Sequence, residues 1–309
     1  MDVLKKKILI IGGSGFIGQA AAEFLSAKGY EVTATYYQSN KKLLKNKKVN
    51  YEKLNLKSEK FNTKIVFKNY DFIIFAGGYI DHSEINQGGI ETLKTHFLSL
   101  IKMSQYIDFK KIQKFIYLGS GDQYGKCNSP VKEDDTYNSR PLTTYSLSKS
   151  LAENYLDFLH LKYGLQYISL RLFLIYGPKQ KKDRLIPYVI STLFKNEKAS
   201  VTAGSQIRDF LYIDDLNELL IKIVKSKNNF SGVLNVGSGK PVTVNKVINL
   251  IKNYINLGKI SVDRQKKMKK NELLKLYPNI SLVKKIYNWR PNTELSEGIK
   301  LTVNFYKNE

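Results

Sequence analysis

A run of closely spaced glycines near the N-terminus constrains the fold of this chain more than any other feature. The apolar segment Lys7–Ile11 is typical of a buried parallel strand, and it runs directly into residues 12–18, Gly-Gly-Ser-Gly-Phe-Ile-Gly. The amphipathic segment that follows is typical of a helix and stops before Gly29. Strand, glycine loop and helix in this order predict a dinucleotide-binding β-α unit.

The glycines have separate expected roles in such a unit. Gly12 permits the tight turn, Gly15 lets the backbone approach a pyrophosphate, and Gly18 lets the helix pack closely on the strand. The helix then begins with its N-terminus facing the phosphates. We therefore predict that Gly12, Gly15, Phe16, Ile17 and Gly18 bind the cofactor.

A tyrosine and a lysine one helical turn apart suggest redox chemistry. Tyr145 and Lys149 stand at positions i and i+4, so their side chains share one face of a helix. An ammonium group near a phenol favours the phenolate form. Tyr145 is therefore a candidate base.

These features and several downstream markers occur in an order that resembles a known family, nearly end to end. The glycine loop, Ala76-Gly77, Ser120 and the Tyr145/Lys149 pair resemble those of the extended short-chain dehydrogenase/reductases, the nucleotide-sugar epimerase and dehydratase family. The C-terminal half carries further markers: Leu170-Arg171-Leu172-Phe173, Tyr176-Gly177-Pro178, Arg208-Asp209-Phe210, Asp214-Asp215 and Trp289-Arg290-Pro291.

The resemblance implies a role for each matching residue. Tyr145 would take a proton from a sugar hydroxyl, and Ser120 would bind the same sugar oxygen. Lys149 would bind the nicotinamide ribose and, together with the cationic nicotinamide ring, lower the pKa of the phenol. Ser120, Tyr145 and Arg208 would contact the substrate, with Arg208 on its pyrophosphate. Further residues are expected to line the cofactor: Asn55, Leu56, Ala76, Gly77, Tyr145 and Lys149.

The implied reaction is oxidation or reduction at C4 of a nucleotide-activated sugar, by a 4-keto reductase or a C4 dehydrogenase. An NAD-retaining 4-epimerase is the close alternative, because it would use the same residues. A 4,6-dehydratase is less favoured, since Gly121 and Asp122 stand where dehydratases carry an Asp and a Glu. Asp122 could still act as a single acid or base, or only fix its loop. A non-catalytic cofactor-binding or RNA-binding protein on the same fold is the alternative of a different class.

Substrate and cofactor are less sharply defined. Gln206 to Phe210 together with Ile186-Pro187-Tyr188 give some likeness to CDP-sugar 4-reductases of the abequose synthase kind. The second strand ends in Thr35-Tyr36-Tyr37-Gln38 without the acidic residue that binds the adenine ribose of NAD. Lys41 or Lys42 could neutralise a 2′-phosphate. The cofactor prediction is therefore NAD(P), with NAD and NADP both open.

The charge of the chain does not indicate nucleic-acid binding. The formal net charge of +23 comes mostly from lysines spread along the whole chain, whereas base readout favours arginine. A basic surface can still attract an anionic nucleotide diphosphate sugar. Cys127 is the single cysteine and the three histidines form no metal-ligand pattern, so neither a disulfide nor a metal is expected. Without a membrane-spanning run or a signal-peptide pattern, we expect a cytoplasmic protein.

Alternating strand and helix patterns predict an α/β fold of the Rossmann type, with a doubly wound parallel sheet and a smaller C-terminal α/β substrate lobe. Strands are expected near residues 8–11, 31–36, 72–75, 114–118 and 167–172, and a helix over residues 216–224. Residues 1–175 would form the dinucleotide-binding domain and residues 176–309 mainly the substrate lobe, with about 209–237 returning to the first domain. By family resemblance, a homodimer or higher homo-oligomer would use the helix over residues 146–163.

Overall fold

The fold is built on one seven-stranded sheet. The structure is a computed structural model that describes residues 5–38, 47–61, 64–138, 140–263 and 273–309. All neighbouring strands of the sheet run parallel, in the order β11-β6-β5-β4-β1-β2-β3. The strands are β1 (Lys7–Ile11), β2 (Glu31–Tyr36), β3 (Asn50–Lys53), β4 (Phe72–Phe75), β5 (Lys114–Ser120), β6 (Tyr167–Leu172) and β11 (Gly232–Val236).

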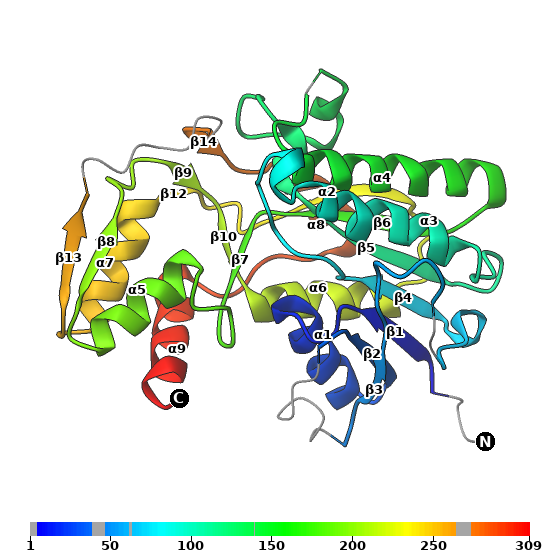
Figure 1. Cartoon of the computed structure of the whole chain (residues 1–309), viewed down its shortest axis with the longest axis horizontal. Helices are drawn as coiled ribbons and strands as arrows, with labels where there is room; N and C mark the ends of the chain where they lie inside the picture. The colour runs from blue at the N-terminus through cyan, green and yellow to red at the C-terminus, as the bar shows by residue number, and fades with distance from the viewer. Residues whose placement is uncertain (1–4, 39–46, 62–63, 139, 264–272) are drawn as a thin grey trace.

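Helices cover both faces of this sheet, because alternate residues of its strands point to opposite sides. Ile8 and Ile10 of β1 pack in one apolar core with residues of α1 (Phe16–Ala27) and α6 (Ile213–Lys225). Leu9 and Ile11 of the same strand pack in a second core with α3 (Ser99–Ser104) and α4 (Thr144–Tyr163). Figure 1 shows the two helical layers on either side of the sheet. The predicted doubly wound Rossmann-type fold is confirmed.

The helix that precedes α3 is irregular. It begins as α2 (Ile90–Leu93), passes through a π-helical turn over Lys94–Leu98, and continues as α3. A π-turn inserts one extra residue and so changes the direction in which the following side chains point. This turn carries His96 into the protein interior, where the side chain is 1% exposed.

A smaller lobe lies at the other end of the molecule (Figure 1). In it, β8 (Lys198–Val201) pairs in parallel with β13 (Lys259–Val262), and α5 (Leu185–Phe194), α7 (Val244–Tyr254) and α9 (Leu295–Lys307) pack together. The remaining elements are short: β7 (Leu174–Tyr176), β9 (Ile207–Arg208), β10 (Phe210–Tyr212), β12 (Val242–Thr243), β14 (Lys275–Leu276) and α8 (Ser281–Tyr287). None of the described helices is long and apolar enough to cross a membrane.

The chain crosses between the two lobes more than once. After the first six strands of the large sheet it enters the smaller lobe at α5, and then returns with α6, which packs on α1. β11 follows and pairs with β6 at the edge of the large sheet. Residues near 213–236 therefore lie with the large sheet, although they follow part of the smaller lobe in sequence.

Candidate active site

Most of the predicted site residues lie at one edge of the large sheet. β1, β4 and β5 are neighbours and run parallel, so the segments that follow them leave from the same edge. Gly12 follows β1, Ala76-Gly77 follow β4, and Ser120 is the last residue of β5. The carboxyl edge of a parallel sheet is where doubly wound folds bind their ligands.

The glycine loop forms a close-packed cradle. Gly12 has a φ of +81°, and a Cβ atom at this position would lie 2.6 Å from the Cα atom of Gly77. A Cβ atom at Gly15 would meet only the Gly12 carbonyl oxygen, at 3.3 Å, so the loop is open on that side. No side chain caps the N-terminus of α1 and no acid lies in its first turn. These features fit the pyrophosphate of a dinucleotide at the backbone N–H groups of residues 16–18.

The segment after β3 reaches the same cradle. A Cβ atom at Gly77 would lie 2.7 Å from Cδ1 of Leu56, so Leu56, Gly77 and Gly12 lie side by side. Asn55 turns its side-chain oxygen to the backbone N–H of Lys57, 3.0 Å away. Asn55 therefore caps its own turn. The lysines considered for a 2′-phosphate, Lys41 and Lys42, lie outside the described residues.

Ser120 ends β5 and begins a short 3₁₀ turn over Gly121–Tyr124. Its hydroxyl accepts a hydrogen bond from the backbone N–H of Asp122 at 3.2 Å. Its own N–H donates to the side chain of Gln123 at 2.8 Å. This reciprocal cap fixes the orientation of the Ser120 hydroxyl. The sequence analysis had not assigned a role to Gln123.

Tyr145 lies in the first turn of α4, where Thr143 caps the helix. Its side chain is 5% exposed and hydrogen-bonds to that of Ser120. Burial raises the pKa of Tyr145 well above its usual range, and the nearby carboxylate of Asp122 raises this pKa further. The bond from Ser120 and the charge of Arg184 lower it by less. In the chain alone, Tyr145 is therefore a neutral phenol.

Lys149 is buried one turn along the same helix. Its Nζ atom donates to the carbonyl oxygen of Leu118 at 2.8 Å and lies 4.9 Å from the centre of the Tyr117 ring. Burial lowers the pKa of Lys149 to about 7. In the chain alone, burial is the largest cause of the pKa shifts of both Tyr145 and Lys149. The expectation that Lys149 and a cationic nicotinamide ring together lower the pKa of Tyr145 applies to the cofactor-bound enzyme and stays a prediction.

Two histidines, which the sequence analysis did not connect with the site, pack against Tyr145. The rings of His82 and His96 both meet the Tyr145 ring edge-on, with centroids 5.4 and 5.5 Å away. The Nδ1 atom of His96 lies 3.0 Å from the hydroxyl of Ser148. The Nε2 atom of His82 lies 3.8 Å from a carboxylate oxygen of Asp122. Asp122 is thus part of the surroundings of Tyr145.

A buried polar network lies behind the Ser120 loop. Glu153, one turn after Lys149, forms an ion pair with Arg171 of β6, and both side chains are at most 7% exposed. The Ser169 hydroxyl also donates to Glu153, at 2.6 Å. The Arg171 guanidinium lies 4.8 Å from the centre of the Tyr124 ring. Arg171, a marker of the sequence resemblance, therefore supports the turn that follows Ser120.

Arg208 lies apart from these groups, in the short strand β9. Its guanidinium donates to the carbonyl oxygens of Ile207 at 2.9 Å and Leu274 at 3.5 Å. Its neighbour Asp209 is buried and accepts hydrogen bonds from the N–H groups of Ser238 and Gly239. These bonds anchor the small sheet, and none of them joins Arg208 to Tyr145.

Two further markers of the resemblance, Asp214-Asp215 and Trp289-Arg290-Pro291, have a structural explanation. Asp215, in the first turn of α6, accepts hydrogen bonds from the N–H groups of Asn292 at 2.8 Å and Thr293 at 3.2 Å. The Trp289 indole N–H donates to the backbone carbonyl of Asp215 at 3.0 Å. The two markers therefore bind one another and join α6 to the C-terminal segment.

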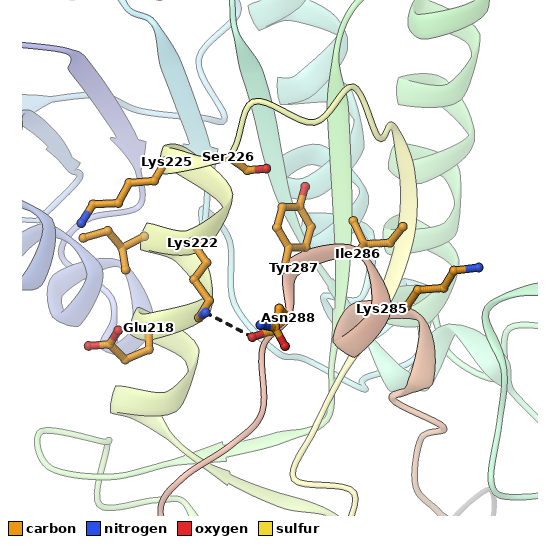
Figure 2. Close-up of a pocket in the computed structure, with 9 residues that line it drawn as sticks. Glu218, Lys222, Lys225, Ser226, Lys285, Ile286, Tyr287 and Asn288 are labelled. Atoms are coloured by element: carbon orange, nitrogen blue, oxygen red, sulfur yellow. Dashed lines mark hydrogen bonds between the residues drawn. The ribbon is translucent and has the colours of Figure 1, made fainter.

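A hollow of about 460 Å³ opens on the surface between α6 and α8. Figure 2 shows Lys222 in this hollow, with its Nζ atom donating to the carbonyl oxygen of Asn288 at 3.1 Å. Ser226 also lines the hollow and lies shortly before β11 in the chain. The hollow is therefore near the amino ends of the strands. The hollow contains none of the predicted site residues, so it is not the candidate active site.

Comparison with known proteins identifies the family. Residues 8–237 match the model of the NAD dependent epimerase/dehydratase family. A provisionally named UDP-glucose 4-epimerase of Methanocaldococcus jannaschii is 30% identical over 97% of this chain and 98% of its own length. The UDP-glucuronate 4-epimerase of Thermodesulfobacterium geofontis is 28% identical, over 97% of this chain and 95% of that protein. The CDP-abequose synthase of Salmonella muenchen is 25% identical, over 97% of each chain.

Solved structures agree with the fold. The UDP-glucuronic acid 4-epimerase of Bacillus cereus, in complex with UDP-glucuronic acid and NAD, is similar with a TM-score of 0.81 at 20% identity, over 98% of this chain and 99% of that one. The matches over most of the chain, together with the glycine cradle and the Ser120, Tyr145 and Lys149 group, confirm the resemblance noted in the sequence. This chain is an NAD(P)-dependent enzyme and belongs to the NAD dependent epimerase/dehydratase family.

Proposed function

We propose that this enzyme oxidises and reduces C4 of a nucleotide diphosphate sugar, and that it does so as an NAD-retaining 4-epimerase. The observation that carries the proposal is the meeting of Ser120, Tyr145 and Lys149 beside the glycine cradle. The sequence alone favours a 4-keto reductase or C4 dehydrogenase over the epimerase. Relatives named as 4-epimerases make the epimerase at least as well supported.

Each site residue has a part in this reaction. Bound NAD would supply a hydride acceptor and a positive charge. Tyr145 would take the proton of the C4 hydroxyl, and Ser120 would hydrogen-bond the same oxygen and hold it in place. Lys149, whose Nζ atom is already oriented by the Leu118 carbonyl, would bind the hydroxyls of the nicotinamide ribose. Because Tyr145 is a neutral phenol in the chain alone, its action as a base requires added positive charge.

The cofactor and the diphosphate of the substrate would occupy opposite parts of the site. We propose that the cofactor lies on Gly12, Gly15, Phe16, Ile17 and Gly18, with Asn55, Leu56, Ala76 and Gly77 beside it. Arg208 would contact the substrate pyrophosphate, where a planar guanidinium can bind two oxygens at once. Relatives that act on UDP-sugars support a nucleotide diphosphate sugar as the substrate class.

A 4-keto reductase remains the second candidate. It is supported by the CDP-abequose synthase relative, which matches over 97% of this chain. A reductase and an epimerase differ in whether the spent cofactor leaves. The site residues are the same for both, so cofactor retention distinguishes them.

The first experiment is therefore mass spectrometry and an absorbance spectrum of the ligand released from freshly purified, denatured protein. Stoichiometric NAD, with inversion at C4 of UDP-glucose or UDP-glucuronate observed by NMR, would support the epimerase. An empty site that consumes added NADPH with a 4-keto nucleotide sugar would support the reductase. Failure to bind either nicotinamide cofactor would overturn the redox proposal.

Replacement of the base tests the assignment of Tyr145. Tyr145→Phe should lower turnover by about 10² to 10⁴-fold while cofactor binding is retained. Tyr163→Phe is the matched control, because Tyr163 ends the same helix and is 50% exposed. Equal turnover in both variants would contradict a catalytic role for Tyr145.

We also propose that the enzyme is a cytoplasmic homodimer. The outer face of α4 carries exposed apolar side chains, Leu147, Phe158 and Leu161, and Leu98 is exposed in the neighbouring π-turn. Such a face is costly to leave in water. Light scattering should give twice the chain mass for the wild type and the single chain mass for Leu161→Lys.

The division into lobes is part of the same proposal. Residues 1–175, with about 209–237, would bind the cofactor, and the rest of residues 176–309 would bind the substrate. The packing of α6 on α1 and the pairing of β11 with β6 support this division.

A further inference from the structure

An ion-pair network beside the glycine cradle joins two segments that follow different strands. The Nζ atom of Lys57, in the segment after β3, lies 2.5 Å from one carboxylate oxygen of Glu91 in α2. The other oxygen accepts a hydrogen bond from Nζ of Lys94 at 2.8 Å. Hydrogen bonds from Lys57 and Lys94 lower the pKa of Glu91 to about 2. The carboxylate is therefore charged at neutral pH, and the proposed C4 reaction uses none of the three groups.

The two lysines connect Glu91 to different parts of the fold. Lys94 stands three residues after Glu91 on the same continuous helix, so this pair stays within one element. Lys57 belongs to the connection between β3 and β4, whereas Glu91 belongs to the connection between β4 and β5. The Lys57–Glu91 bridge therefore ties two crossover segments together, and the Lys94 pair does not.

The segment that carries Lys57 is fixed at the rim of the cradle. Leu56 lies against Gly77, where an added Cβ atom would be 2.7 Å from the Cδ1 atom of the leucine. On the other side, Lys102 of α3 donates a hydrogen bond to the backbone carbonyl of Ser58. Lys57 thus extends from a turn that is held at both of its neighbours.

The order of the strands places this network at the adenosine end of the proposed cofactor. The strands run β3-β2-β1-β4-β5 across this part of the sheet. The proposed cofactor has its pyrophosphate at the loop after β1 and its nicotinamide beside Ser120, at the end of β5. Its adenosine then extends in the opposite direction from β1, toward the segments that follow β2 and β3. Lys57 lies in the second of these segments.

Two exposed tyrosines lie next to the bridge. Tyr37 follows β2 and is 54% exposed, and Tyr79 lies in the segment after β4 and is 40% exposed. The Lys57 Nζ atom lies 5.8 Å from the centre of the Tyr79 ring. The pKa of Lys57 is raised, first by its hydrogen bond to Glu91 and to a smaller extent by the two nearby phenols. Aromatic rings open to solvent at this place can pack on the flat face of an adenine.

We propose that the Lys57–Glu91 bridge holds the two segments around the adenosine at the spacing of the bound state, and thereby slows the release of NAD. The inference rests on the proposed function, which takes NAD as a retained cofactor with its nicotinamide beside Tyr145. A ligand leaves when the segments that enclose it separate, and the bridge opposes this separation. Such a bridge suits an enzyme that retains NAD, whereas a reductase must exchange its cofactor in every turnover.

The release rate of NAD measures the effect of the bridge directly. The enzyme is loaded with radiolabelled NAD and mixed with a large excess of unlabelled NAD, and the label that stays with the protein is followed by rapid gel filtration. We expect Lys57→Gln and Glu91→Gln each to release NAD about three- to fivefold faster than the wild type. The double variant should release NAD no faster than the faster single variant, because both changes break the same bridge.

Lys94→Gln is the matched control. It removes one positive charge and one hydrogen bond to the same carboxylate, as Lys57→Gln does, but it leaves the two segments joined. Its release rate should stay within about twofold of the wild-type rate. The side chains of Lys57 and Lys94 are 41% and 48% exposed, so both variants should fold as the wild type does.

Salt supplies a second measurement. The bridge is partly exposed to solvent, so ions in solution screen the attraction between its two charges. Raising the ionic strength from about 0.05 M to about 0.5 M should accelerate release more in the wild type than in Lys57→Gln, so that the two rates converge. A change in the general attraction for the anionic cofactor would instead alter both rates by the same factor, and that result would contradict the bridge.

The outcomes separate this inference from the proposed function. Release from Lys57→Gln at the wild-type rate would overturn the role of the bridge and leave the retained NAD and the C4 reaction standing. Equal acceleration in Lys94→Gln and Lys57→Gln would show that the lost positive charge determines the release rate, with the same consequence for the bridge. A wild-type protein that binds no NAD would overturn both proposals.

Discussion

His96 donates a hydrogen bond through Nδ1 to the hydroxyl of Ser148, 3.0 Å away. Ser148 gives its own single proton to the backbone carbonyl of Tyr145 at 2.7 Å, so this hydroxyl can only accept from His96. Burial, together with the charge of Lys149, holds the pKa of His96 well below its usual range. The imidazole is therefore neutral, with the proton on Nδ1 and the lone pair on Nε2.

The tautomer of His96 is directly measurable. We expect ¹⁵N NMR of labelled enzyme to show one histidine protonated on Nδ1, with no change in its signals between pH 8 and 5.5. The signal should disappear in His96→Phe, which identifies it. In urea the same residue should titrate near the ordinary value of about 6.5. A folded-state signal that titrates above pH 6 would contradict the neutral buried imidazole.

The close approach of His96 to Gly78 predicts a severe effect of adding one methyl group. Gly78 has a φ of +101°, and a Cβ atom there would lie 2.0 Å from Nε2 of His96. Gly78→Ala should lower the free energy of unfolding by about 3 to 5 kcal/mol, from backbone strain and displacement of the buried ring. Urea denaturation measures this loss.

Gly29 supplies the matched control. Its φ is +93°, but a Cβ atom there would meet nothing within 4 Å. Gly29→Ala should therefore lower the free energy of unfolding by backbone strain alone, about 1 kcal/mol. His96→Ala combined with Gly78→Ala should recover about 1 to 3 kcal/mol relative to the sum of the two single changes. Equal losses in the two glycine variants would show that the ring does not oppose the methyl group.

Because the pKa of Lys149 is lowered to about 7, the contribution of Lys149 to the free energy of unfolding depends on pH. The unfolded lysine holds its proton up to about pH 10.4, so between pH 7 and 10.4 the unfolded chain binds more protons than the folded chain. The contribution of Lys149 to stability therefore rises with pH across this window. Below pH 7 the buried charge carries its full penalty.

Lys149→Met removes that penalty. We expect the variant to have a higher free energy of unfolding than the wild type. This margin should shrink by on the order of 3 to 5 kcal/mol as the pH rises from 6 to 9.5. Lys162→Met is the control, since Lys162 is exposed on the same helix, and its margin should stay constant. A margin for Lys149→Met that does not change with pH would contradict the burial of a neutral amine.

The parts of the fold that were predictable have strong local patterns. β2, β4 and β6 coincide with the expected strands at 31–36, 72–75 and 167–172, because these segments are rich in apolar and β-branched residues. β3 was not predicted. Its residues, Asn50–Lys53, are mostly polar and partly exposed, and they form a strand only by pairing with β2 at the edge of the sheet.

The candidate site was predictable only where its residues are close in sequence or match a motif. Tyr145 and Lys149 meet because a helix brings positions i and i+4 together. His82 and His96 were missed because only the folded sheet brings the loop after β4 and the π-helical turn to the start of α4. The raised pKa of Tyr145 in the chain alone was not predicted, since the local sequence does not show how completely this side chain is desolvated.

Helix boundaries show the same limit. The helix expected at 216–224 begins three residues earlier, at Ile213, because Asp214 and Asp215 form its first turn. Acidic side chains are favourable there, next to the positive end of the helix. The C-terminal helix α9 was not predicted, although Leu295, Ile299 and Val303 recur every four residues and two of them are buried.

The buried ion pair of Glu153 and Arg171 predicts that a single change costs more than a double one. Arg171→Met leaves a carboxylate buried with only the Ser169 hydroxyl and no cation, and should cost about 3 to 5 kcal/mol of unfolding free energy. Adding Glu153→Gln removes the charge and keeps an oxygen for Ser169, so the double variant should recover most of this loss. Urea denaturation measures both variants.

Lys7→Met is the control. This change breaks the exposed pair with Glu31 and should lower the free energy of unfolding by under about 1 kcal/mol. An equally small loss for Arg171→Met would mean that Glu153 takes up a proton when the cation is removed, and the stability of that variant would then increase as the pH is lowered.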